Sequence, residues 1–159
     1  MEHAAAEAPG WLLALEQSGL GRAMRTSFWL YPAVETLHIL GFALLVGSIV
    51  TFDARVVVGS RQLDPRVWER LVLPVTRAGF ALAVPMGLLL FVTEATAYVT
   101  NPAFRLKLLL LVVALANIAL YHTLSRRAAG LTGTMRVAAA ASLVLWIGVL
   151  ACGRLIAYV

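Results

Sequence analysis

Four long apolar runs without any Asp, Glu, Lys or Arg constrain this chain more than any other feature of its sequence. They cover residues 36–52, 78–93, 108–125 and 137–153. Once one charge near an end is admitted, each reaches the roughly 17–25 residues that a helix needs to cross a bilayer. The runs are apolar all round, whereas a helix of a soluble bundle keeps one polar face toward water. The sequence therefore predicts an all-α fold, a polytopic membrane four-helix bundle.

Local signals place the ends of the four spans. Pro32 suits the first turn of a helix, Asp64-Pro65 opens the next helix, and Asn101-Pro102 makes a tight turn. We expect spans over residues 30–56, 67–98, 103–126 and 134–157, all within a single integral membrane domain that covers 1–159. Pro85 should kink the second span near its middle.

The segment before the first span has a different pattern. Apolar and polar side chains alternate there at helical spacing, which predicts an amphipathic interfacial helix over residues 10–27. The residues that carry the pattern are Trp11, Leu12, Leu15, Leu20 and Met24 on the apolar side, and Glu16, Gln17, Arg22 and Arg25 on the polar side.

The charge balance predicts orientation rather than nucleic-acid binding. The chain is 61% hydrophobic and 13% charged, with a net charge of +5. Of its 13 Lys and Arg residues, 8 fall on the side opposite the N-terminus, and such an excess marks the cytoplasmic side. We therefore expect a multi-pass protein of the bacterial inner membrane with both termini in the periplasm. The lipid bilayer is the expected partner, and a homo-oligomer or a larger membrane complex is left open.

Ionisable residues near the N-terminal side of the spans form one predicted polar layer. Such groups are rare inside membrane spans and indicate function by default. The layer has two interpretations: interfacial ion pairs with snorkelling bases, or a ligand or proton-transfer site open to the periplasm. Its members are Glu35, His38, Glu94, Lys107 and Arg154.

A second polar cluster is predicted on the cytoplasmic side, from Asp53, Arg77 and His122. An Asp–Arg pair that closes this end is the favoured interpretation. Asn117 and Tyr121 lie one turn apart and should make interhelical hydrogen bonds. Small residues on the first span, Gly41, Gly47 and Ser48, should allow close helix approach.

The histidines raise the question of haem. Both imidazoles of a bis-histidine haem must lie at one depth, but the spacing puts His38 and His122 about 16 Å apart along the membrane normal. A bis-His haem within one chain is therefore disfavoured, while a quinone or a haem held by His38 alone stays open. Metal binding has only the weak candidates Glu35, His38 and Glu94, which show no diagnostic spacing. The single Cys152 excludes an intrachain disulfide.

The motifs WLYPAVETLHILG (29–41), LVGS (45–48) and DAR (53–55) carry a resemblance. With LEQS (15–18) and MRTS (24–27) before them, they resemble an uncharacterised family of small four-span bacterial inner-membrane proteins with an N-terminal amphipathic segment. The chain is more distantly similar to copper-resistance D-like membrane proteins, which also carry a His near the start of an apolar span. The resemblance implies the four-span architecture and draws attention to Glu35, His38, Asp53 and Arg55.

No common enzyme signature is found in the sequence: it has no Gly-rich phosphate loop, no HExxH helix and no nucleophile elbow. We therefore expect a non-enzymatic membrane protein that binds a small ligand, ion, cofactor or partner at the periplasm-facing polar layer. One alternative is a redox subunit that uses haem or quinone through His38. An oligomeric transporter and a purely structural assembly subunit are the others.

Overall fold

The computed structural model describes residues 9–58, 65–128 and 130–159, and every regular element in these ranges is a helix. Four helices are long: α4 (Leu30–Val58), α5 (Pro65–Thr93), α7 (Pro102–Arg127) and α8 (Gly133–Leu155). Each contains a stretch long and apolar enough to cross a membrane. The predicted all-α class and the four long apolar helices are confirmed.

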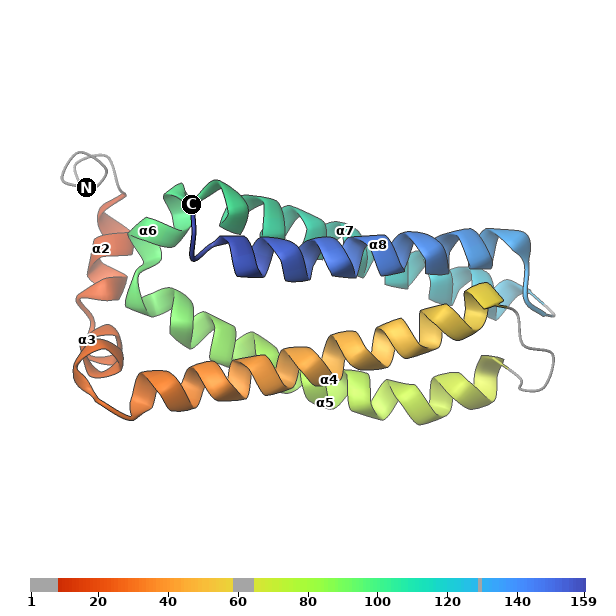
Figure 1. The fold of residues 1–159 in the computed structure, drawn as a ribbon, viewed down its shortest axis with the longest axis horizontal. Helices are drawn as coiled ribbons and strands as arrows, with labels where there is room; N and C mark the ends of the chain where they lie inside the picture. The colour runs from red at the N-terminus through yellow and green to blue at the C-terminus, as the bar shows by residue number, and fades with distance from the viewer. Residues whose placement is uncertain (1–8, 59–64, 129) are drawn as a thin grey trace.

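The long helices form two antiparallel hairpins (Figure 1). Helix α4 packs on α5, α7 packs on α8, and the hairpins join through α4 and α8. Within the described residues, no Cα atom of α5 lies within 8 Å of a Cα atom of α7 or α8. The spatial order is therefore α5–α4–α8–α7, and the backbones of α5 and α7 lie farther apart than those of adjacent helices.

Glycine brings α4 and α5 together. A Cβ atom added to Gly41 would lie 2.6 Å from the backbone N of Ala83, and one added to Gly79 would lie 2.5 Å from the backbone N of Leu45. One turn beyond Leu45, Ser48 Oγ lies 2.8 Å from Thr76 Oγ1. The expected close approach is confirmed at Gly41. It is wrong at Gly47, where an added Cβ would meet nothing within 4 Å.

Two clusters of buried side chains fill the interior. One lies where the hairpins meet, around Leu45, Ile49, Trp146 and Val149. The other surrounds Tyr121, near the C-terminal ends of α4 and α7. The outward faces of the long helices are also apolar. Their exposed residues include Ile39, Leu88, Leu109 and Val144, each at least 60% exposed. Exposed apolar area of this extent is typical of a surface that contacts lipid.

The N-terminal segment is two short helices, α2 (Gly10–Glu16) and α3 (Gly19–Thr26), instead of the predicted single helix. The helical conformation is interrupted at residues 17–18. Ser18 Oγ accepts a hydrogen bond from the Gly21 amide and caps the start of the second helix. Both helices cross the same end of the bundle (Figure 1). Leu12 and Met24 are buried there, each 1% exposed. We call this the N-terminal end.

Two charged side chains attach the N-terminal helices to the bundle. Glu16 Oε1 accepts hydrogen bonds from the amide and the hydroxyl of Thr96, both at 2.7 Å. Arg25 donates to the carbonyl oxygens of Thr93 (2.7 Å) and Glu16 (2.6 Å). These contacts explain why the second span ends earlier than predicted. Glu94 leaves the helical conformation, and the short helix α6 (Ala95–Thr100) turns the Thr96 amide toward Glu16.

Candidate functional site

His38 is held in place by the neighbouring helix α5. Its Nδ1 lies 2.8 Å from the carbonyl oxygen of Ala83. Because a carbonyl can only accept, Nδ1 carries the proton, and Nε2 of the neutral ring is an acceptor. Gly87, one turn further along α5, leaves room for the ring: a Cβ there would lie 2.9 Å from His38 Cε1. The imidazole is therefore oriented by contacts with α5.

Lys107, from α7, directs its ammonium group into the bundle at the same end. Its Nζ lies 5.7 Å from the centroid of the Phe42 ring. It is also 3.6 Å from the position that a Cβ on Gly153 of α8 would take. The His38 ring lies 6.1 Å from the same Phe42 ring. Two helices that are not adjacent, α4 and α7, thus bring an imidazole and an ammonium group to one aromatic side chain.

Among the described residues, the titratable groups that act on Lys107 do not include a carboxylate. They are Cys152 and His38. An ammonium group removed from water is costly unless it is paired or hydrogen-bonded. The cation–π contact with Phe42 offsets only part of this cost, since such contacts contribute about 0.5–2 kcal/mol. The arrangement therefore favours an incoming anion or oxygen acceptor.

Glu35 and Glu94 lie closer to the surface than His38 and Lys107, and both are exposed. They act on a pair of tyrosine hydroxyls, Tyr31 and Tyr98, which also interact with each other. Burial, the Tyr31 hydroxyl and the two carboxylates raise the pKa of Tyr98 to about 12. Tyr98 consequently remains a hydrogen-bond donor over the physiological pH range.

Tyr31 and Tyr98 are members of this group that the sequence analysis did not single out. A signal was present: Tyr31 precedes Glu35 by four residues, so the two lie on one face of a helix.

Arg154 lies apart from the other members of the predicted polar layer. Its guanidinium group donates to the Tyr158 hydroxyl and stacks 4.9 Å from that ring. The structure thus divides the layer into an inner pair, His38 and Lys107, a surface group with Glu35 and Glu94, and the separate Arg154. Among the described residues, no three His, Cys, Asp or Glu side chains come close enough to hold a metal ion.

The predicted cytoplasmic-side cluster is also divided. Asp53 and His122 line one hollow at the end of the bundle opposite α2 and α3, whereas Arg77 is exposed and does not line it. Asn117 makes the expected interhelical hydrogen bond, from its Nδ2 to the carbonyl oxygen of Ala138 at 2.9 Å. Tyr121 packs edge-on against Phe52, with the ring centroids 5.4 Å apart.

The two histidines of the long helices lie at opposite ends of the bundle. Asp53, which shares the hollow with His122, follows His38 by fifteen residues on α4, or about 22 Å along the helix axis. His38 and His122 therefore cannot ligate one iron from its two sides. Comparisons of the chain with protein-family models, curated proteins and solved structures found no match.

Proposed function

We propose that this chain is a multi-pass protein of the bacterial inner membrane that binds a small ligand at its N-terminal end, between His38 and Lys107. The observation that carries the proposal is the ammonium group of Lys107, which lies 5.7 Å from the Phe42 ring that the His38 ring also approaches. The excess of Lys and Arg on the opposite side supports a periplasmic position for this end.

The two side chains define the chemistry of the ligand. Lys107 offers hydrogen-bond donors and positive charge, so it selects an oxygen acceptor or an anion. Nε2 of His38 is an acceptor, so it selects a hydroxyl or another donor. A quinol carries two hydroxyl groups on opposite sides of one ring, so one can donate to His38 Nε2 while the oxygen of the other accepts from Lys107. A lipid-soluble quinol therefore fits this pair.

A single-His haem is a second candidate, because one observation favours it. Metal-ligating histidines almost always donate their second ring N–H to a carboxylate, carbonyl or water, and His38 donates to Ala83 in this way. An absorption spectrum of natively purified protein separates the two candidates. A Soret band that His38→Ala removes supports haem. A colourless protein with quinone in its lipid extract supports the quinol.

The binding proposal is tested with a soluble quinol analogue, decylubiquinol, titrated into detergent-solubilised protein while Trp fluorescence is recorded. Lys107→Met and His38→Ala should each weaken binding at least about tenfold, the scale of one hydrogen bond to a charged group. Arg105→Gln is the matched control for charge, being an exposed base two residues away on α7. Thr36→Val is the matched control on α4. Equal affinities in all four variants, or no binding by the wild-type chain, overturn the proposal.

The orientation is tested separately with reporter fusions at the C-terminus. Alkaline phosphatase, which folds in the periplasm, should be active there, and green fluorescent protein should not fluoresce. The reverse pattern contradicts the proposed topology, although it leaves the binding test unaffected.

A further inference from the structure

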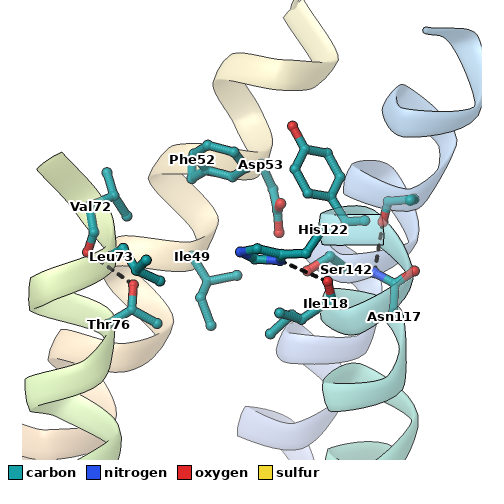
Figure 2. A pocket seen from close by; sticks show the side chains of 12 residues that line it. Ile49, Phe52, Asp53, Val72, Leu73, Thr76, Asn117, Ile118, His122 and Ser142 are labelled. Atoms are coloured by element: carbon teal, nitrogen blue, oxygen red, sulfur yellow. Dashed lines mark hydrogen bonds between the residues drawn. The ribbon is translucent and has the colours of Figure 1, made fainter. Parts of the chain in front are cut away.

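A hollow lies at the end of the bundle opposite α2 and α3 (Figure 2). All four long helices line it, and the part of it comparable with an enclosed cavity has a volume of about 70 Å³. Its walls are largely apolar, with Ile49 and Phe52 from α4, Leu73 from α5 and Ile118 from α7. This lining suits a small, mostly apolar molecule.

Two buried polar side chains in the hollow each have an oxygen atom without a hydrogen-bond partner. Asp53 is 6% exposed and Ser142 is 2% exposed, and neither Asp53 Oδ2 nor Ser142 Oγ has a partner. The two groups interact with each other, but without the geometry of a hydrogen bond. Figure 2 shows the Asp53 carboxylate pointing into the space that His122 enters from α7. The hollow thus presents one unsatisfied carboxylate oxygen and one unsatisfied hydroxyl within apolar walls.

The hollow lies near an apolar outward surface. It lies between α5 and α7, whose Cα atoms do not approach within 8 Å of each other in the described residues. The rings of Phe91 and Phe104 bridge these helices by stacking 5.7 Å apart, but they do so at the N-terminal end. The outward faces near the hollow are apolar, as at Leu71 (66% exposed) and Leu120 (51% exposed). The outward surface near the hollow is therefore suited to contact lipid.

We infer that the hollow binds an organic ammonium ion with an apolar body. The ammonium group would donate hydrogen bonds to Asp53 Oδ2 and Ser142 Oγ, while the body would pack against Ile49, Phe52 and Leu73. A buried carboxylate is strongly destabilised unless it is paired with a cation, so a positive charge is the feature that Asp53 selects. This site shares no residue with the His38–Lys107 site and does not depend on it.

The test measures binding of 2-phenylethylamine to the detergent-solubilised protein by isothermal titration calorimetry. Asp53→Asn should weaken binding by about thirtyfold or more, the loss expected when one partner of a buried charge pair is removed. Thr51→Val is the matched control: it lies two residues away on α4, is exposed and does not line the hollow. Its affinity should equal that of the wild-type protein.

Two further measurements separate a binding role from a structural one. The uncharged analogue 2-phenylethanol should bind much more weakly than the amine, because it lacks the charge that Asp53 pairs with. Leu73→Trp should block the hollow from α5 and abolish amine binding while it retains Asp53. The inference is overturned if the wild-type protein does not bind the amine, or if the alcohol binds equally well. It is also overturned if folded Asp53→Asn, judged by gel filtration and thermal unfolding, keeps the wild-type affinity.

Discussion

A methyl group added at Gly41 tests how α4 and α5 are held together. The Cβ of Gly41→Ala would lie 2.6 Å from Ala83 N and 3.0 Å from both Ala83 Cα and Gly79 O. All three are backbone atoms, which cannot rotate away as a side chain can. Ordinary contact begins at 3.4 Å, so the helices must separate locally by about 0.8 Å, the difference between 3.4 Å and 2.6 Å.

The cost follows from this displacement. Overpacking of a well-packed contact costs about 1–3 kcal/mol. The Gly-to-Ala change in a helix interior by itself stabilises by roughly 0.5–1 kcal/mol. Gly47→Ala, on the same helix, should gain only this stabilisation and no overpacking cost, because an added Cβ there meets nothing within 4 Å. The difference in unfolding free energy between the two variants therefore isolates the steric cost, about 1–3 kcal/mol.

The assay is reversible unfolding of both variants in mixed micelles, followed by circular dichroism, with Gly41→Ala expected to be the less stable. Separation of α4 from α5 should also lengthen the hydrogen bond from His38 to Ala83, which lies beside Gly41. Ligand affinity at the N-terminal end should consequently fall in Gly41→Ala and not in Gly47→Ala. Equal stabilities of the two variants would refute the close packing of α4 against α5.

Three further outcomes are expected. Glu16→Ala removes the acceptor for both Thr96 donors, so amide hydrogen exchange in α2 and α3 should accelerate while the long helices keep their protection; unchanged protection would contradict this docking. Tyr98→Phe should remove an ionisation step near pH 12 from the absorbance titration at 295 nm; because the pKa of Tyr98 is raised in the fold, its contribution to stability is complete below pH 10 and is lost between pH 10 and 12. Asn101→Ala removes the cap of the Phe104 amide and the bond to the Ile156 carbonyl, so the unfolding free energy should fall by about 1 kcal/mol; no change in thermal midpoint would count against it.

The candidate site could be predicted only in part from the sequence. His38 and Lys107 were expected at one depth, because depth follows from residue count along a helix. The direction in which Lys107 and Arg154 point could not be derived from depth. Lys107 turns inward because Gly153 on α8 leaves space for it, whereas Arg154 turns to Tyr158 on its own chain segment. Gly153 is distant from Lys107 in the sequence, and Tyr158 lies beyond the end of α8, so neither contact follows from depth along a helix.

The sequence by itself determined the four long helices, their approximate ends and the polar residues within them. These properties are local, since they follow from apolar run length, from Pro102 and Asn101 at a helix start, and from the absence of charges in the runs. Only the tertiary structure decided which faces meet. The backbone contact at Gly41, the break at Glu94 and the placement of Asp53 beside Ser142 each require two segments far apart in the chain. Helical periodicity states where a side chain points on its own helix, but the neighbour it meets is set by the packing of the whole bundle.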